Sequence, residues 1–416
     1  MTNWAGNVAF SADEVVRPES VEEVQTIVRN AKKIRAVGAR HSFNDIADTV
    51  GTQVSLAKLN RVLSLDRDAN TVTVQAGIKY GDLAYYLDGE GYALHNLASV
   101  QHITVAGACS TGTHGSGMKN GNLATAVVAL EFVTAAGDLV TLTRRRDSNQ
   151  FHGAVVGLGG LGVVTSLTLE VQPRFDVAQV VYRNMPMAEL KEFTAIMSSG
   201  DSVSMFTDWR GKNFNQVWIK TRVGDATVEP ASDFFGAKRA DRNMHTMDEH
   251  SAETCTEQMG IAGPWCDRLP HFRREFNPTA GQELQSEYFV PIETAYEAIM
   301  AIEEVHDQIT PHLFISEIRT VAADELWMSP CYGKACASVH MTWTPDWENV
   351  RQLLPLIEQK LAPFNPVPHW GKLFTMSTAV LQSRYEKLGD FRELVGQHDP
   401  RGKFRNAFLA RNIYDG

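Results

Sequence analysis

Two short segments in the second half of the chain carry polar residues at a spacing that could build a chemical site on one face of a sheet. The segment SEIRT contains Glu317 and Arg319, and the segment SVHMTW contains His340 and Thr342. Side chains two residues apart on a strand point to the same face. Both pairs interrupt runs typical of buried strands, where a charged group needs a partner or a ligand. For Glu317 and Arg319 the alternative is a cross-strand ion pair on the surface.

The segment PHWGK adds a fifth group, Lys372. A carboxylate, a guanidinium, an imidazole and a hydroxyl on one face can each pair with a hydroxyl of a polyhydroxylated molecule, and such a site rejects molecules that lack those hydroxyls. The chain has no G-x-S-x-G segment, and His340, His114 and His102 lack the spacing of metal ligands. We therefore expect no metal, and we expect a bound organic cofactor to perform the chemistry.

A cofactor site is indicated by two segments of small residues in the first half of the chain. Residues 104–122, TVAGACSTGTHGSGMKNGN, offer few side chains that could build a core, and small residues leave backbone N–H groups accessible to phosphate oxygens. The spacing is neither that of a P-loop nor that of a G-x-G-x-x-G dinucleotide fold. In the second segment, RAVGARHSFN at 35–44, His41 lies in a loop, where an exposed and functionless histidine is the default expectation.

Local patterns predict the elements that would position these groups. Residues 19–33 predict an amphipathic helix with Ser20 as N-cap and Glu23 three residues later. A short buried strand is predicted at 34–39, so the His41 loop begins at a strand end. The other elements predicted in the first half are a strand at 71–77, a helix from Gly81 or Asp82 to Gly89 or Gly91, strands within 126–143, and a strand ending before Pro173.

The composition changes after Pro173, where we place a domain boundary. A helix at 291–309 and strands at 313–321 and 337–344 indicate a separate α+β domain. The tail at 385–408 is predicted to be helical up to a turn at Asp399 and Pro400. Because the tail is too short to form a domain, we expect it to return and pack on the first one.

Chain length, net charge and cysteine content exclude further classes of partner and location. The 416 residues exceed the usual length of a single core, and 39 basic against 49 acidic residues give a net charge of −10, which argues against nucleic acid as a partner. Five cysteines without a C-x-x-C pair favour a reducing compartment over a disulfide framework or a zinc site. The N-terminus is acidic where a signal peptide is basic, and no window is long and apolar enough to span a bilayer. We expect a cytoplasmic monomer with no membrane partner.

The order of the motifs resembles that of the vanillyl-alcohol oxidase superfamily of flavoproteins. GARHSF, VAGACSTGTHGSG and GLGVVTSLTL resemble its FAD domain, which holds the flavin's pyrophosphate on backbone amides. Within it, the chain is similar to the alditol oxidases from TNWAGN to DPRGKFRNAF, with THGSG, QSEY, EIRTVAAD, SPCYG and PHWGK in the same order. The resemblance implies an α+β fold with a PCMH-type FAD-binding domain at 1–173, a substrate-binding cap domain at 174–376 and a C-terminal segment at 377–416 that returns to the first domain.

The resemblance also implies roles for individual residues. His41 matches the position at which the family attaches FAD covalently through an imidazole nitrogen. Many relatives have Ser-Gly where this chain has Ala39 and Arg40, so the loop loses a glycine and gains a large cation. The residues that match FAD contacts are Ala36, Val37, Gly38, Ala39, Arg40, His41, Ser42, Ser99, Thr104, Gly107, Ala108, Cys109, Ser110 and Val164. Those that match the substrate site are Ser99, Glu317, Arg319, Thr342 and Lys372, with His340 in the same pocket.

The activity implied by the resemblance is FAD-dependent oxidation of the terminal C1 hydroxyl of an alditol, such as xylitol or sorbitol, to an aldose with reduction of O2 to hydrogen peroxide. We expect the charges of Lys372 and Arg319 to favour alkoxide character in the substrate. His340 is the expected proton acceptor, and Lys372 could take that role only if its pKa is lowered. Glu317, Ser99 and Thr342 are expected to orient the hydroxyls.

Three other functions fit the same residues. An aldonolactone oxidoreductase shares the E-x-R pair and an H-W-x-K segment. A flavin dehydrogenase would use a carrier instead of O2, and a sugar-binding protein would hold no flavin. Ala98, beside Ser99, is small enough to be compatible with oxygen reaching the flavin. The size of that side chain does not decide between oxidase and dehydrogenase.

Overall fold

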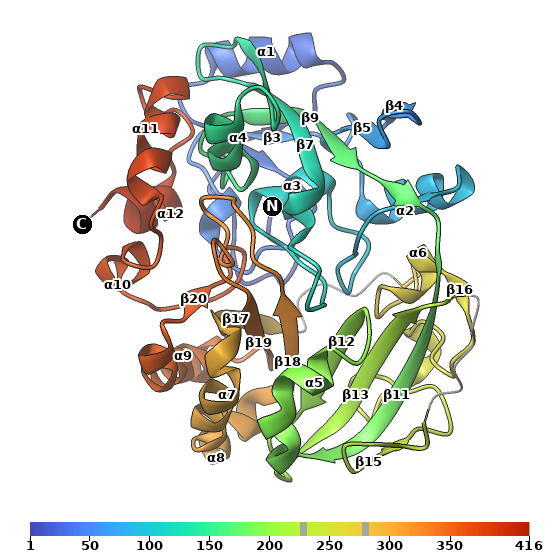
Figure 1. Ribbon diagram of the computed structural model, residues 1–416. Coiled ribbons are helices and arrows are strands. Elements are labelled where there is room, and N and C mark those ends of the chain that lie inside the picture. Colours follow the sequence, from blue (N-terminus) through green and yellow to red (C-terminus); the bar gives the residue numbers. More distant parts are fainter. Residues whose placement is uncertain (225–230, 277–282, 416) are drawn as a thin grey trace.

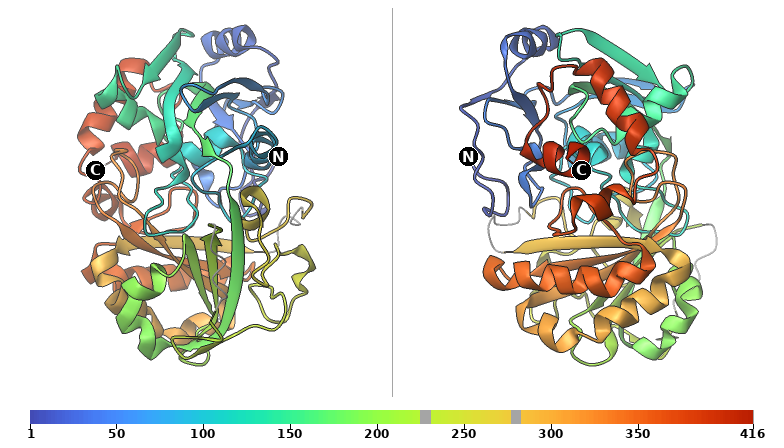
Figure 2. Two further views of the ribbon diagram at one scale, coloured as in Figure 1. Left: turned by 45° about the vertical axis from the view of Figure 1, so that its right-hand side comes forward. Right: turned by 90° about the vertical axis from the view of Figure 1, so that its left-hand side faces the viewer.

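The computed structural model describes residues 1–224, 231–276 and 283–415. The chain forms two parts, one above the other in Figure 1, and both termini lie in the upper part. The upper part is built from the first elements of the chain and from the last helices (Figure 2). The strand β10 ends at Pro173 and β11 begins at Asp176 in the lower part, next to the predicted boundary.

Two small sheets form the centre of the upper part. The first is parallel, with the order β1-β3-β2, and β2 leads directly into the His41 loop. The second is antiparallel, with the order β4-β5-β9-β7-β8. The bounds of the strands are β1 Glu14–Val16, β2 Ile34–Val37, β3 Thr52–Ser55, β4 Val62–Asp66, β5 Thr71–Gln75, β7 Val127–Val133, β8 Leu139–Thr143 and β9 Val163–Glu170, with β6 Tyr92–Ala93 pairing with β10 Gln172–Pro173.

The helices of the upper part begin and end close to the predicted positions, with two differences. In α1, Val21–Asn30, the Ser20 side chain accepts a hydrogen bond from the Glu23 N–H, as the N-cap pattern predicts. Helix α2, Tyr80–Gly89, begins one residue before the predicted start, because the buried Tyr80 belongs to its first turn. The second difference is α3, Val105–Ser110, which was not predicted and buries Val105, Ala108 and Cys109 in the core.

The lower part is dominated by a ten-stranded antiparallel sheet, with the order β14-β15-β11-β13-β12-β18-β19-β17-β20 and β16 beside β11. Helices α5, α7 and α9 cover one face of this sheet, and the opposite face looks toward the upper part (Figure 2). The strands are β11 Asp176–Pro186, β12 Ser202–Thr207, β13 Asn213–Arg222, β14 Asp233–Phe234, β15 Ala237–Arg239, β16 Gly263–Pro264, β17 Leu284–Pro291, β18 Leu313–Val321, β19 Cys336–Trp343 and β20 Val367–Pro368. The remaining α-helices are α4 Ser148–Val155, α5 Phe193–Met197, α6 Trp265–Arg268, α7 Ala295–Glu303, α8 His306–Ile309, α9 Trp347–Leu361, α10 Thr378–Gln382, α11 Leu388–His398 and α12 Ala407–Leu409.

The last helices return to the upper part and share its core. Leu388, Phe391 and Leu394 of α11 are buried in the same cluster of apolar side chains as Phe151 of α4. A second core lies between the large sheet and the helices beneath it. The strands that face the upper part are therefore held from below by packed helices.

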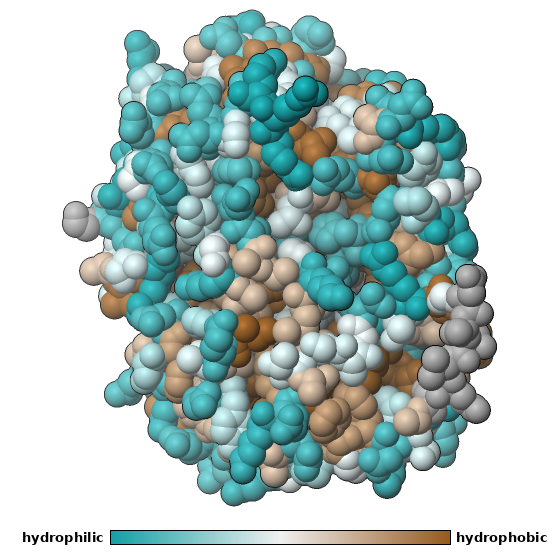
Figure 3. All heavy atoms as spheres, in the orientation of Figure 1, coloured by the Kyte–Doolittle hydropathy of each residue, from teal (hydrophilic) through white to brown (hydrophobic). Residues whose placement is uncertain are grey.

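Hydrophilic and hydrophobic side chains are interspersed on the face of the molecule in Figure 3. No helix in the described ranges is long and apolar enough to cross a membrane.

Candidate active site

A cavity of about 1120 Å³ lies between the two parts of the molecule. Its upper walls come from the β2 end, from the start of α3 and from the segment before β9, and its lower wall comes from β17, β18 and β19. The volume is slightly above the range common for sites that hold a cofactor or a drug-sized molecule. All the polar groups singled out in the sequence on β18, on β19 and at Lys372 line this cavity.

The loop 38–42 presents its backbone to the cavity. None of its five backbone N–H groups donates a hydrogen bond within the described residues. Arg40 has a φ of 64°, and a left-handed residue of this kind can turn successive N–H groups toward a common point. Such an arrangement binds anionic oxygens.

The loop and α3 approach each other too closely for side chains between them. A Cβ added at Gly38 would lie 2.3 Å from the Thr104 side-chain oxygen, and one at Gly107 would lie 2.8 Å from the same atom. A side chain at either position would collide with the Thr104 hydroxyl, so glycine at both positions lets the loop pack closely against the start of α3. The pyrophosphate of a dinucleotide fits a wall of this type.

The expected cofactor contacts lie along this wall with one exception. Thirteen of the fourteen residues line the cavity: Ala36, Val37, Gly38, Ala39, Arg40, His41, Ser42, Ser99, Thr104, Gly107, Ala108, Ser110 and Val164. Cys109 does not line the cavity. It points into the core, where its Sγ lies 3.4 Å from the Tyr80 hydroxyl, because residues on opposite sides of a short helix face different environments. The Arg40 guanidinium donates a hydrogen bond of 2.9 Å to the Thr2 carbonyl.

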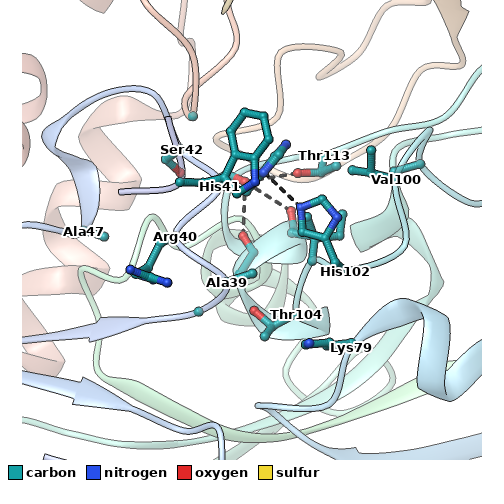
Figure 4. A pocket seen from close by; sticks show the side chains of 18 of the residues that line it. Ala39, Arg40, His41, Ser42, Ala47, Lys79, Val100, His102, Thr104 and Thr113 are labelled. Carbon is teal, nitrogen blue, oxygen red and sulfur yellow. Dashed lines mark hydrogen bonds between the residues drawn. The ribbon is translucent and has the colours of Figure 1, made fainter. Parts of the chain in front are cut away.

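His41 is half-buried and lies against two other rings. The Trp4 ring centroid is 4.5 Å from that of His41. His102 Nε2 is 3.1 Å from His41 Nδ1 (Figure 4). Desolvation by burial lowers the pKa of His41 well below its usual range, and the charge of Lys372 lowers it further. His41 is therefore a neutral imidazole at neutral pH, the form in which a ring nitrogen can act as a nucleophile.

Ionisable side chains of the large sheet lie at paired positions on neighbouring strands. His340 lies opposite Glu287 on one neighbouring strand and opposite Glu317 on the other. Arg319 Nη2 donates to Glu287 Oε1 over 2.8 Å, and His114 Nε2 lies 3.0 Å from the same oxygen. The alternative of a surface ion pair at Glu317 and Arg319 is wrong, because both side chains are buried.

Both carboxylates of this cluster remain ionised despite their burial. Burial alone would raise the pKa of Glu317, but Arg319 and His271 beside it bring the pKa well below its usual range. The pKa of Glu287 is likewise lowered, since His114 and Arg319 outweigh the effect of burial. The cavity floor thus holds two fixed anions around one fixed cation.

Lys372 lies at the other side of the cavity floor. Its ammonium group donates to Gln285 Oε1 and lies 4.8 Å from the centroid of the Phe43 ring. Burial lowers the pKa of Lys372 to about 8. This value makes a neutral amine available near physiological pH, which an ordinary lysine does not offer.

His340 is a weaker base than the sequence suggests. Its Nε2 lies 3.1 Å from Gln285 Oε1, and its Nδ1 is buried with no hydrogen-bond partner in the described chain. Burial and the nearby charge of Lys372 lower the pKa of His340 to about 3. A ring with so low a pKa stays neutral at physiological pH and holds a proton poorly.

Several cavity residues were not identified from the sequence. His271, Gln285, Glu287, His369 and Trp4 line the cavity, as do His114 and His102, for which the sequence suggested no role. Of these, only Glu287 and Gln285 carried a signal, because both alternate on one face of β17 within the QSEY motif region. The others come from loops without periodicity.

The chemistry available in the cavity is recognition and activation of a hydroxylated molecule. Ionised carboxylates accept hydrogen bonds from hydroxyls, Arg319 donates, and Lys372 can either donate or take up a proton. Ser99 and Thr342, the two hydroxyl side chains expected at the substrate site, also line the cavity. A backbone-lined cleft for a cofactor and a polar floor for a substrate therefore share one cavity.

Comparison with protein families gives two matches along the chain. Residues 12–143 match the model of an FAD binding domain, and residues 279–412 match that of D-arabinono-1,4-lactone oxidase.

Curated relatives match over the full length. The chain is 45% identical to the alditol oxidase of Streptomyces sp. (strain IKD472), with 100% of this chain and 99% of the relative covered. It is 28% identical to the L-gulonolactone oxidase of Mus musculus over 99% of this chain and 98% of the relative. With the L-gulono-1,4-lactone dehydrogenase of Mycobacterium tuberculosis it shares 27% identity over the same fractions.

Among solved structures, a cholesterol oxidase from B. sterolicum has the same fold. The TM-score is 0.78 with 15% sequence identity, and the match covers 99% of this chain and 96% of the other. The expected two-domain α+β flavoprotein fold is thus confirmed.

Proposed function

Because the chain belongs to the alditol oxidase family of FAD-binding proteins, we propose that it oxidises the terminal C1 hydroxyl of an alditol to an aldose and reduces O2 to hydrogen peroxide. The observation that carries this proposal is the 45% identity to an alditol oxidase along the whole chain. The cavity supports it with buried ionised carboxylates that suit a chain of hydroxyl groups.

The upper walls of the cavity fit FAD. The unpaired N–H groups of 38–42 and the close approach of Gly38 and Gly107 to Thr104 would hold its pyrophosphate. When bound, FAD accepts the hydride from the substrate carbon and passes the electron pair to O2. The protein's part is to bind the alditol, orient its C1 and manage the hydroxyl proton.

We place the covalent attachment of FAD at His41. Its imidazole is neutral, lies on the cavity wall and lacks a charged partner that would hold it protonated. His102, the ring nearest to its Nδ1, also has a lowered pKa, to about 4, mainly through burial. In this contact one ring nitrogen carries the hydrogen and the other accepts it, so the two neutral rings hold each other in place by an N–H···N hydrogen bond.

The hydroxyl proton is assigned to Lys372 instead of His340. The condition set by the sequence, a lowered pKa for Lys372, is met, whereas His340 has a pKa of about 3. Arg319 stays charged and would stabilise negative charge on the reacting oxygen as the proton leaves. His340, whose Nε2 lies 3.1 Å from Gln285 Oε1, would help to hold Gln285 against Lys372.

The proposal is tested by supplying the purified holoprotein with xylitol and sorbitol in air and measuring hydrogen peroxide, with no dye added. We expect peroxide release that saturates with the alditol. A panel that includes L-gulono-1,4-lactone and D-arabinono-1,4-lactone runs beside it. Absence of peroxide with every alditol would contradict the proposed function.

A second candidate function is favoured by the match of 279–412 to the model of D-arabinono-1,4-lactone oxidase. This activity would give peroxide with the lactones only. A dehydrogenase would instead turn over with a dye and release no peroxide in air. The same panel, run in air and then again with an electron-accepting dye, separates the three enzymes.

A Glu317→Gln substitution is expected to weaken alditol binding while the flavin stays bound. The amide keeps the shape of the side chain but removes the negative charge that accepts hydrogen bonds, and hydrogen bonds to charged groups contribute about 1.5–3 kcal/mol, or about tenfold to a hundredfold in half-saturating concentration. Steady-state peroxide release against xylitol concentration measures this change, and the visible spectrum reports the flavin.

The matched control is Asp82→Asn at the cavity rim. Asp82 carries the same charge but pairs with Arg274 on the surface. Saturation of the Glu317 variant at the wild-type concentration would place the alditol elsewhere in the cavity.

We also propose a reducing, cytoplasmic location. All five cysteines of the chain are buried and unpaired, as suits a protein that meets no oxidising environment. Recovery of the protein outside the cytoplasm after cell fractionation would overturn this assignment.

A further inference from the structure

A buried lysine lies behind the cavity floor without lining it. Lys220, on β13, is 1% exposed and is absent from the cavity wall. Its ammonium group donates to the carbonyls of Leu269 and Pro270, the second over 3.1 Å, and lies 3.1 Å from His271 Nδ1. One lysine thus satisfies three acceptors of a single short segment, 269–271.

His271 connects this lysine to the cavity. Because its Nδ1 accepts from Lys220, its proton must sit on Nε2, which lies 2.8 Å from Glu317 Oε1 and donates to it. The rings of Trp218 and Phe206 surround His271 at centroid distances of 5.1 and 5.7 Å and leave the imidazole little freedom.

The same residue also contacts the upper part of the molecule. The backbone N–H of His271 donates to the Ser99 carbonyl over 3.1 Å. Ser99 and Glu317, two expected substrate contacts that lie far apart in the sequence and on opposite walls, are therefore both tied to His271. No such tie could be read from either motif alone.

We propose that Lys220 and His271 are positioning residues for the alditol: the hydrogen-bonded chain from Lys220 to His271 fixes Glu317, and the backbone N–H of His271 holds the Ser99 carbonyl. The inference rests on the proposed function for the identity of the substrate. The substrate site is then supported from outside the cavity by Lys220, which does not contact the substrate.

His271 and Glu317 have the protonation states that this direction of the chain requires. Burial lowers the pKa of Lys220 to about 7, and the negative charge of Glu317 opposes this effect. Burial, together with the charge of Lys220, lowers the pKa of His271 to about 4, so the ring is neutral and donates from one nitrogen only. Glu317 stays ionised and is held as an acceptor.

The test compares His271→Gln with His271→Asn in the holoenzyme. A glutamine amide extends to about the position of the imidazole Nε2 and can still donate to Glu317. The shorter asparagine reaches only the position of Nδ1 and can meet Lys220 alone. We expect the asparagine variant to need about tenfold to a hundredfold more xylitol for half-saturation, and the glutamine variant to stay within about threefold of the wild type.

Flavin content, read from the visible spectrum, should be unchanged in both variants. A merely structural role for His271 predicts equal losses for both substitutions, and that result would overturn the proposal. Lys220→Met should shift half-saturation in the same direction as the asparagine variant.

A second measurement does not depend on the substrate. In protein labelled with ¹⁵N-histidine, the His271 signal, identified by its absence in the glutamine variant, should show protonated Nε2 and unprotonated Nδ1. A proton on Nδ1 would disprove the chain from Lys220. If the wild type oxidises no alditol, the proposed function fails, and this signal still decides whether Lys220 and His271 are linked as described.

Discussion

Replacing Lys372 with alanine is expected to slow substrate oxidation by about a hundredfold to ten thousandfold, the usual contribution of a positioned proton acceptor. The physical reason is the environment of its amine, whose pKa burial lowers to about 8. Alanine removes both the acceptor and the hydrogen bond to Gln285. FAD should remain bound, because the wall of 38–42 and α3 is untouched. Stopped-flow reduction of the flavin by xylitol, without oxygen, measures the effect.

The control for this variant is Lys372→Arg, which keeps the positive charge but cannot lose its proton. If Lys372 acts as the acceptor, the neutral amine is the active form, so the wild-type kcat/KM should rise as the pH increases through about 8 and then level off. The arginine variant should be slow and should lack this rise. An arginine variant with the wild-type rate would show that only the positive charge at position 372 is required. The role of proton acceptor would then be assigned to His340.

The strands of the site could be predicted from the sequence, and their partners could not. Glu317 and Arg319 share a face because side chains alternate on any strand, and this needs no knowledge of the fold. The contacts of His114 with Glu287 and of Lys220 with His271 join segments that are distant in the chain. Such contacts depend on which strands become neighbours, and local periodicity does not encode that.

One expectation failed, and another leads to a different proposal, for physical reasons that the sequence does not carry. The segment 104–122 was expected to contribute little to a core, yet Val105 and Cys109 are fully buried because a short helix directs them inward. His340 was expected to take the proton because free imidazole titrates near neutral pH. In the assembled cavity, burial lowers the pKa of His340 to about 3 and that of Lys372 to about 8, so we propose Lys372 as the acceptor.

A His41→Ala variant is expected to release essentially all of its FAD on acid precipitation, whereas the wild type should keep the flavin in the pellet. The proposed covalent bond at His41 would be the only link to survive unfolding, since hydrogen bonds from the 38–42 backbone disappear with the fold. Before acid is added, the variant should still bind FAD, because those N–H groups do not depend on the side chain at 41. Flavin fluorescence of the supernatant, and the mass of the wild-type peptide containing residues 35–44, provide the measurement.

Arg40→Gly is the matched control in the same loop. Arg40 has a φ of 64°, a conformation that glycine adopts without strain, and its guanidinium binds the Thr2 carbonyl. The glycine variant should therefore keep the shape of the loop and retain acid-stable flavin. Flavin that stays in the pellet of the His41 variant would move the attachment to another residue, and His102, with Nε2 3.1 Å from His41 Nδ1, is the first to replace with alanine.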